Sequence, residues 1–524
     1  MKHFAALLDA LVYMPSRNGK LRLIRRYLDT APDPDRGWAL AALTGDGNFR
    51  RIKPGMVREL AGVRLDPVLF GWSYDFVGDL AETLALMWPE GADAVPAPSL
   101  GEMVERLGTA KKGDLADLLA GWLDGLDSTG RWALLKFLMG GLRVGVSARL
   151  AKTALAQWGG VEPDEIEELW HGLEPPYADL FAWLDGRAEK PDVSSRPVFH
   201  PVMLANPLGD GDLANLDPAD YQAEWKWDGI RVQVVARGGD VRLYTRTGED
   251  IGAGFPDILA GVDFDGAIDG ELLVRDTAAG EPASFNALQQ RLNRKNVSRA
   301  MLRDAPAFIR VYDMLFEGME DIRRLPLAER RARLERWIAA RDRNRFDFSD
   351  TITFESWEEL ADLRRTTREN GIEGLMLKRR DTAYLPGRPR GPWFKWKRDP
   401  LTADAVLMYA VRGHGKRSGL YSDFTFGVWR EDGELTPVGK AYFGFTDEEL
   451  GQLDRWIRAH TTNRFGPVRE VERGLVLEVA FDSLHESKRH KSGIAMRFPR
   501  ISRIRWDKPV EEADSLATLS SLIV

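Results

Sequence analysis

The sequence has 524 residues, and because single domains usually contain about 100–200 residues, we expect about three domains. Apolar residues make up 44% and charged residues 29%, a globular composition. No uninterrupted apolar stretch of roughly 18 residues is present, which excludes a membrane-spanning helix. The chain contains no cysteine, so any metal must be held by oxygen atoms or by the few histidines, as suits Mg²⁺.

The net charge of −7 opposes nucleic-acid binding overall, because phosphate contacts need lysine and arginine. The distribution is uneven, however. Between Leu484 and Pro509 the only acidic residues are Glu486 and Asp507, whereas eight are basic: Lys488, Arg489, Lys491, Arg497, Arg500, Arg503, Arg505 and Lys508. The first twenty residues contain an apolar run without a small-residue cleavage site, which predicts an amphipathic helix and no secretion. We expect a cytoplasmic protein, associated with the nucleoid in a bacterium.

Residues 1–190 form the first predicted domain, which we expect to be all-helical. Apolar residues recur at helical spacing, for example at 114–123 and 132–139. Ser147 suits the N-cap of a helix that carries Leu150, Ala154, Leu155 and Trp158 on one face, after a glycine-containing turn at 140–145. By itself, this pattern fits equally well a helical hairpin whose role is only to pack.

Residues 196–398 form the second predicted domain, after a polar, proline-bearing linker at 187–198. Short β-rich runs predict strands at 231–236, 241–246, 270–274, 308–312 and 374–378. Helical patterns intervene at about 284–304 and 326–341. The result is a mixed α/β domain with largely antiparallel sheets.

Residues 399–524 form the third predicted domain. Strands are predicted at 405–411, 421–429 and 475–481, with one helix near 447–459. A small β-barrel fits this pattern, and such barrels commonly bind nucleic acid.

The segment from Glu224 to Arg231 places Lys226 after a short strand and before an Asp-Gly turn. Taken alone it is weak evidence, because surface lysines beside such turns are common. Five further segments follow it in order: Tyr244-Thr-Arg-Thr-Gly-Glu-Asp, Asp269-Gly-Glu271, Val311-Tyr-Asp-Met-Leu, Glu373-Gly-Leu-Met-Leu-Lys378 and Trp393-Phe-Lys-Trp-Lys397. Together the six segments resemble the covalent nucleotidyltransferase superfamily, specifically ATP-dependent DNA ligases.

The resemblance implies a multidomain chain with an all-α N-terminal DNA-binding domain, an α+β nucleotidyltransferase (adenylation) domain and a C-terminal OB-fold β-barrel. It also implies that Lys226 carries AMP as a phosphoramidate. A lysine attacks phosphorus only as a free amine, so we expect nearby cations to discourage its proton: Arg231, Arg246, Lys395, Lys397 and a metal ion.

Two carboxylate groups are candidates for Mg²⁺ or a ribose hydroxyl. Asp269 and Glu271 are two apart in a predicted strand and therefore point to one face, although an exposed strand edge is the common outcome for such a pair. By resemblance Glu271 is the functional member. Glu373 follows Asn370-Gly371 and opens an apolar strand, where it suits a second ligand on the metal side.

Tyr312 lies in an apolar strand, where an aromatic residue is also typical of the core, but the resemblance makes it the platform for adenine. Lys395 and Lys397 alternate with aromatic residues, so one face of their strand is cationic, as a triphosphate pocket requires, although a solvated edge strand has the same pattern. Family members often carry arginine at the position of Pro389. Arg388 and Arg390 flank it, and either can substitute.

The segments at the two ends of the chain extend the resemblance. Arg505-Trp-Asp-Lys508 is similar to the family's last motif, whose cations orient the pyrophosphate leaving group, although a generic basic tail has a similar composition. Residues 137–147 are similar to a helix-turn segment of the DNA-binding domain of larger ligases, which favours a DNA ligase over its relatives.

The predicted function is ATP-dependent sealing of nicks in duplex DNA, with a place in replication, repair and recombination. The predicted catalytic residues are Lys226, Arg505 and Lys508; the predicted ATP-binding residues are Glu224, Lys226, Arg231, Arg246, Glu271, Tyr312, Glu373, Lys395 and Lys397; the predicted metal ligands, for Mg²⁺ or Mn²⁺, are Glu271 and Glu373. A monomer that binds nicked DNA is expected. Two alternatives stay open: an RNA ligase or capping-type nucleotidyltransferase, and a non-catalytic nucleic-acid-binding scaffold.

Overall fold

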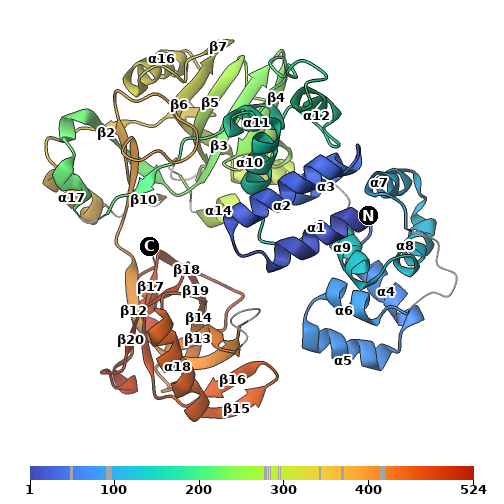
Figure 1. Ribbon diagram of the computed structural model, residues 1–524. Helices are drawn as coiled ribbons and strands as arrows, with labels where there is room; N and C mark the ends of the chain where they lie inside the picture. Colours follow the sequence, from blue (N-terminus) through green and yellow to red (C-terminus); the bar gives the residue numbers. More distant parts are fainter. Residues whose placement is uncertain are drawn as a thin grey trace. The chain divides into compact units, whose positions relative to one another are not determined.

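The computed structural model describes residues 1–47, 51–89, 97–209, 211–276, 280, 282–283, 285–292, 294, 297–341, 344–367, 371–413 and 419–523 (Figure 1). The chain divides into two compact units, each built from separate stretches of sequence. Unit 1 comprises Met1–Asn206, Gly229–Ser349 and Arg379–Trp393, and unit 2 comprises Pro207–Asp228, Asp350–Lys378 and Phe394–Val524. The boundary between the two units divides the predicted domain at 196–398. The chain crosses it between Lys226 and Arg231, within a single sequence segment.

Described residues up to 184 are helical apart from their connections, as predicted. The helices are α1 (Lys2–Tyr13), α2 (Arg17–Thr30), α3 (Asp35–Thr44), α4 (Pro54–Arg64), α5 (Pro67–Val77), α6 (Leu80–Met87), α7 (Leu100–Thr109), α8 (Leu115–Asp124), α9 (Ser128–Met139), α10 (Ala148–Gly159), α11 (Pro163–Trp170) and α12 (Ala178–Leu184). Their apolar faces share one core, to which Ala154 and Leu155 contribute while Leu150 and Trp158 pack at its edge. The Ser147 hydroxyl accepts a hydrogen bond from the Leu150 amide, which confirms the predicted N-cap.

The second part of unit 1 is a six-stranded sheet, with strand order β4-β3-β5-β6-β7 and with β8 beside β6. The strands are β3 (Ile230–Arg237), β4 (Asp240–Thr245), β5 (Gly266–Val274), β6 (Ala307–Glu317), β7 (Glu320–Asp321) and β8 (Phe346–Phe348). All neighbours are antiparallel except β6 and β8. Four helices accompany the sheet: α13 (Pro256–Leu259), α14 (Phe285–Gln289), α15 (Arg299–Asp304) and α16 (Leu327–Ala339). In Figure 1, α16 lies beside β6, which it contacts along its length.

A five-stranded sheet, most of which belongs to unit 2, has the order β1-β11-β10-β2-β9. The strands are β1 (Asn206–Pro207), β2 (Tyr221–Trp227), β9 (Thr351–Ile352), β10 (Ile372–Arg379) and β11 (Trp393–Lys397), and α17 (Trp357–Thr366) packs on them. Apolar side chains such as Ala223, Leu375 and Phe394 point to α17, which leaves the opposite face of β2 and β10 for charged residues.

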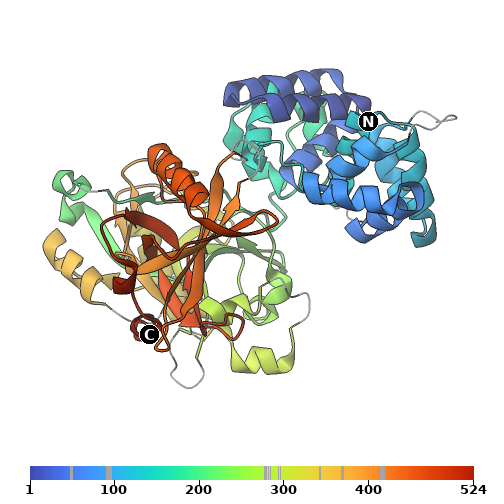
Figure 2. The same cartoon turned by 90° about the horizontal axis from the view of Figure 1, so that it is seen from below.

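The remainder of unit 2 is a β domain. Its strands are β12 (Leu401–Arg412), β13 (Tyr421–Trp429), β14 (Leu435–Ala441), β15 (Thr461–Phe465), β16 (Val468–Val471), β17 (Val476–Phe481), β18 (Ser483–Glu486), β19 (Ile494–Arg497) and β20 (Arg500–Arg505), with helices α18 (Asp447–Ala459) and α19 (Leu516–Ser520). The order β14-β13-β12-β16-β15 is extended by β17, which pairs with both β12 and β20, while β18 and β19 form a separate hairpin. Figure 2 shows these strands in orange to red, curved around a common core.

Most predicted elements are confirmed, and the differences are local. The predicted helix at 447–459 is α18, and the predicted strand at 421–429 is β13. The helical pattern at 284–304 instead forms two short helices, α14 and α15, and of the described residues between them 290–292 form turns while 294, 297 and 298 belong to no regular element. Asn370, which was expected to begin the turn before Glu373, lies outside the described residues.

Candidate active site

Lys226 lies near the end of β2, and its amine donates a hydrogen bond to the Glu373 carboxylate on β10. The two strands are neighbours in the five-stranded sheet, and the Asp228 amide donates to the Gly371 carbonyl at 2.6 Å, which holds the chain after Lys226 against β10. The side chains of Lys226 and Glu373 are 22% and 19% exposed. The amine is therefore partly buried and directed by a carboxylate.

Further charges surround this pair. The Arg497 guanidinium, on β19, forms an ion pair with Asp228 and lies 3.9 Å from Glu373. The Lys397 amine lies 3.7 Å from Glu373 and 3.3 Å from Asp482. We call this group the nucleophile cluster: Lys226, Asp228, Glu373, Lys397, Asp482 and Arg497. It balances three cations against three carboxylates, so a phosphate group entering it would displace carboxylates from cations already in place.

The pKa values of Glu373 and Asp228 are shifted in opposite directions. Burial by itself raises the pKa of Glu373, but Lys226 and Lys397 lower that pKa to about 2. Burial also raises the pKa of Asp228, and although the Arg497 guanidinium lowers it, the neighbouring Glu373 carboxylate supports the rise. Glu373 is thus the member that keeps its charge to the lower pH, and Asp228 is the member that takes up a proton first.

A pH-dependent stability follows from Glu373. Because its pKa is lower in the folded than in the unfolded chain, its stabilising contribution is present above the ordinary value of about 4.5 and is lost as the pH falls from there through about 2. We expect the gap in unfolding temperature between wild type and Glu373→Gln to be largest near neutral pH and to shrink below about pH 4.5. Asp228 is present in both proteins, and because the Glu373 charge raises its pKa, the Glu373→Gln change is expected to lower that pKa. Thermal unfolding followed by circular dichroism at a series of pH values measures the gap in unfolding temperature, and a gap that stays constant down to about pH 3 contradicts the assignment.

The expectation that surrounding cations discourage the Lys226 proton stays a prediction, and the contact found for the amine is with a carboxylate. The group in contact with the amine is a carboxylate, and an opposite charge stabilises the ammonium form. Lys397 and Arg497 approach the same place, but each contacts a carboxylate. Loss of the Lys226 proton therefore requires that Glu373 find another cationic partner.

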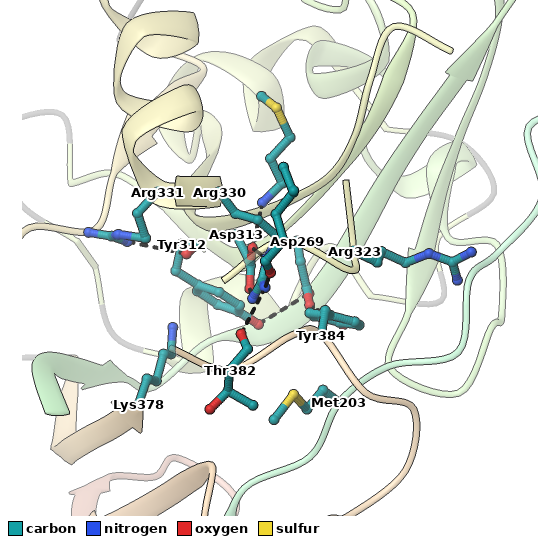
Figure 3. Close-up of polar contacts among 12 residues, drawn as sticks. Met203, Asp269, Tyr312, Asp313, Arg323, Arg330, Arg331, Lys378, Thr382 and Tyr384 are labelled. Atoms are coloured by element: carbon teal, nitrogen blue, oxygen red, sulfur yellow. Dashed lines mark hydrogen bonds and ion pairs between the residues drawn. The ribbon is translucent and has the colours of Figure 1, made fainter. Parts of the chain in front are cut away.

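A second group of polar residues lies in unit 1 and is centred on Asp269 of β5 (Figure 3). Arg231, on β3, forms an ion pair with Asp269 at 2.6 Å, and the hydroxyls of Tyr312 and Tyr384 donate to the same carboxylate at 3.2 and 2.6 Å. We call Arg231, Asp269, Tyr312 and Tyr384 the aspartate cluster. Asp269 is fully buried, so its charge is satisfied by these groups alone rather than by water.

Glu271 stands opposite Arg231 in the register of β5 and β3, on the strand face that also carries Asp269. It is half-buried, whereas Asp269 is fully buried. A side chain at Gly229 would approach the Glu271 Cγ within 2.7 Å, so glycine is required where the segment begun by Lys226 passes this strand. Arg246 is exposed in the turn after β4.

Glu224 and Lys395 occupy different environments. Glu224 is 1% exposed and forms an ion pair at 2.9 Å with the equally buried Lys378. Its carboxylate is therefore engaged within the sheet. Lys395 is half-buried on β11 and alternates with Phe394 and Trp396, which pack in the apolar core of this sheet.

The cations of the last sequence segment contact a different carboxylate. Arg505 and Lys508 lie 3.3 and 2.7 Å from Asp404, and Arg505 also pairs with Asp507 at 3.0 Å. None of the contacts found among the described residues joins either cation to Lys226. Pro389 accepts a hydrogen bond from Asn206 through its carbonyl, and both flanking arginines are exposed.

The histidine, aspartate and glutamate side chains were compared with the requirements of a metal site. Across the described ranges no group of three or more histidine, aspartate and glutamate side chains is arranged to hold a metal ion. Mg²⁺ needs no such group, because it usually takes one or two carboxylates together with waters and substrate phosphates. The charged carboxylate of Glu373 fits that pattern. No described helix has the length and apolarity needed to cross a membrane.

Comparison with known proteins decides the family. The model of the ATP dependent DNA ligase domain matches residues 202–397, and that of the ATP dependent DNA ligase C terminal region matches residues 417–508. A probable DNA ligase of Koribacter versatilis is 36% identical over 410 residues, which cover 73% of this chain and 70% of that protein. The chain belongs to the ATP-dependent DNA ligase family. ATP is therefore the co-substrate of this ligase.

Other relatives agree with this assignment. DNA ligase 1 of Korarchaeum cryptofilum is 30% identical to the ligase, over 79% of this chain and 75% of that protein. A probable DNA ligase of Opitutus terrae, 31% identical, aligns with 99% of this chain, which covers 62% of the relative. The solved structure named Pmar-Lig_PreS3 has a similar fold, with a TM-score of 0.60 at 17% identity over 96% of this chain and 99% of its own. The relatives favour a DNA ligase over the two alternatives left open by the sequence.

Three members of the nucleophile cluster were not predicted from the sequence of the ligase. Asp228 is part of the Lys226 segment, and Arg497 is in the basic C-terminal stretch, so a signal existed for both. Asp482 lies between β17 and β18 without any distinguishing pattern. The structure brings Lys226, Glu373 and Lys397 together, and it brings Arg231 and Tyr312 together, as separate groups.

Proposed function

We propose that the ligase seals nicks in duplex DNA through an AMP carried on Lys226. The observation that supports this most is the contact of the Lys226 amine with Glu373 in a partly buried cluster of alternating charges. A lysine required only for solubility would project into water. Here the position of Lys226 is fixed by the hydrogen bond of the Asp228 amide to Gly371 and by the contact of its amine with Glu373 on β10.

In the first step the Lys226 nitrogen attacks the α-phosphorus of ATP. A nitrogen–phosphorus bond forms, the bond from the α-phosphorus to the bridging oxygen breaks, and pyrophosphate leaves with the electron pair. The ammonium must first lose its proton to solvent water, and it does so more readily once the charge of Glu373 is neutralised by another cation. Glu373 would hold a divalent ion such as Mg²⁺, which would supply that charge and stabilise phosphate oxygens, and by resemblance Glu271 is proposed as a further metal ligand.

The remaining residues that resemble the family's nucleotide-binding motifs are proposed for separate parts of the ATP molecule. Tyr312 offers a half-buried ring as a platform for adenine, and Glu271 offers a carboxylate for a ribose hydroxyl or for the metal. Lys395 and Lys397 are proposed for the phosphates, and Arg246 and either Arg388 or Arg390 for the outer part of the site. Glu224 and Arg231 are held by buried ion pairs, so their proposed contribution is to shape the site.

The C-terminal β domain, which we propose to be an OB-fold barrel, serves different steps through different cations. Arg505 and Lys508 are proposed to orient pyrophosphate during the first step. Arg497, which contacts Asp228, is proposed to serve the two later steps, in which AMP passes to the 5′-phosphate of the nick and the 3′-hydroxyl then displaces it. One domain can deliver two sets of cations in turn if it moves between steps.

Separate substitutions distinguish these roles. We expect Arg497→Ala to slow sealing by pre-adenylated enzyme about 10–100-fold while adenylation stays within a few-fold, because Arg497 is proposed to act only in the later steps. The paired change Arg505→Ala and Lys508→Ala is expected to do the reverse. Rapid-quench assays of adenylation and of single-turnover sealing measure both. Equal losses in both assays for either protein contradict the division of labour.

Nick sealing itself tests the function. The helical domain and the barrel are proposed to bind DNA phosphates without sequence specificity, as a monomer, so binding should weaken with salt. A labelled duplex with one nick, incubated with the ligase, ATP and Mg²⁺, is expected to yield a joined strand. The same nick in RNA is the comparison. Joining of RNA in preference to DNA, or of neither, would overturn the proposal.

A further inference from the structure

Tyr384 is a buried tyrosine that no step described above uses. It lies between β10 and β11, is 3% exposed, and packs in an apolar cluster with Tyr244 and Trp393. Its hydroxyl donates to Asp269 Oδ2 at 2.6 Å and accepts from Arg231 Nη2 at 3.0 Å. Burial raises the pKa of Tyr384 well above its ordinary value, so the hydroxyl remains a donor.

The four hydrogen bonds to Asp269 fill its carboxylate. Oδ1 accepts from Arg231 Nε at 3.1 Å and from the Tyr312 hydroxyl at 3.2 Å, and Oδ2 accepts from Arg231 Nη2 at 2.6 Å and from Tyr384. A carboxylate has about four lone-pair sites, so no position remains for water. Figure 3 shows Tyr312 and Tyr384 pointing toward Asp269 from different elements.

The Arg231 guanidinium is likewise held by several hydrogen bonds. Besides its bonds to Asp269 and Tyr384, its Nη1 donates to the Met203 carbonyl at 2.6 Å. The guanidinium carbon lies 5.8 Å from the centre of the Tyr312 ring and 5.7 Å from that of Trp393. The Tyr312 ring is therefore held through its hydroxyl by Asp269 and beside its face by Arg231, and the Tyr384 hydroxyl contacts both of these residues.

We infer that Tyr384 is a positioning residue for ATP binding: through Asp269 and Arg231 it fixes the Tyr312 ring in the orientation that receives adenine. The inference rests on the proposed role of Tyr312. It predicts that loss of the Tyr384 hydroxyl weakens ATP binding and leaves the chemistry of Lys226 almost unchanged. A purely structural role would lower stability without this selective effect.

The test compares Tyr384→Phe with Tyr244→Phe. Tyr244 is a matched control because it is 7% exposed, belongs to the same apolar cluster, and donates its hydroxyl to the Pro197 carbonyl at 2.7 Å, outside the aspartate cluster. We expect Tyr384→Phe to raise the ATP concentration that half-saturates adenylation about tenfold, the effect of one buried hydrogen bond to a charged group. Its rate at saturating ATP should stay within about threefold of wild type, and Tyr244→Phe should change neither.

Two outcomes overturn the inference: the same half-saturating ATP concentration for Tyr384→Phe and Tyr244→Phe, or a fall in the saturating rate alone. Circular dichroism reports whether each variant is folded. If Tyr384→Phe does not fold, Asp269→Asn tests the same link, because it replaces one acceptor oxygen by a donor and should also weaken ATP binding. The proposed function fails differently: wild type would form no adduct, or Tyr312→Leu would leave ATP binding unchanged.

Discussion

Replacing Lys226 by alanine is expected to abolish the AMP adduct. After incubation with ATP and Mg²⁺, wild type should gain the mass of one AMP and Lys226→Ala should gain none, with sealing reduced at least about 10⁴-fold because the nucleophile is missing. Intact-protein mass spectrometry measures the adduct, and a nick-sealing assay measures the rate. Peptide mapping should locate the AMP on Lys226.

The Lys226→Arg variant keeps a positive charge at this position but removes the amine that is proposed to attack phosphorus. A guanidinium can still pair with Glu373, but it stays protonated at any accessible pH and cannot attack phosphorus. We therefore expect this variant to be as stable as wild type and as inactive as Lys226→Ala. Lys440→Ala, which removes an exposed lysine of β14, is the control and should form the adduct normally. An adduct on either Lys226 variant, or none on wild type, refutes the assignment.

Glu373→Gln is expected to have the second-largest effect, slowing adenylation about 10²–10³-fold. The amide keeps the shape of the side chain but loses the charge that directs the Lys226 amine and that would hold a divalent ion. The variant should also need more Mg²⁺ for half-maximal rate. Adenylation rates measured over a range of Mg²⁺ concentrations report both effects.

Asp482→Asn is the matched control for Glu373→Gln. Asp482 contacts Lys397, as Glu373 does, but none of its contacts in the described part of the chain is with Lys226. We expect its adenylation rate to stay within a few-fold of wild type. Equal losses in the two variants would mean that the charge of the cluster as a whole, and not the contact with Lys226, is what matters.

Local patterns in the sequence were sufficient to predict the elements with clear periodicity. The alternation of apolar residues in β13 and the helical spacing in α18 each depend on neighbours along the chain. The hairpin of β15 and β16 was not predicted, because Thr461–Phe465 is polar and largely exposed and so carries no alternation. The short helix α17 was likewise not predicted.

Contacts between distant residues could not be derived from such patterns. Lys226 and Glu373 are 147 positions apart, and Asp228 and Arg497 are 269 apart. The resemblance between motifs named Glu373 as a site residue, but only the sheet order, with β2 beside β10, indicates why its carboxylate meets the amine. Asp228 and Arg497 each lie in a segment that the sequence singled out, but only their contact with one another in the fold indicates a place at the site.

The carboxylate of Asp404 has a consequence for turnover. It is 14% exposed, holds Arg505 and Lys508, and its Oδ1 has no hydrogen-bond partner among the described residues. If these two cations orient pyrophosphate, the departing product competes with a carboxylate attached to the same domain. Asp404 then recaptures both cations as soon as the product loosens, which speeds its escape and makes rebinding unfavourable. A feature that looks like a simple ion pair would thus help to make the first step run in one direction.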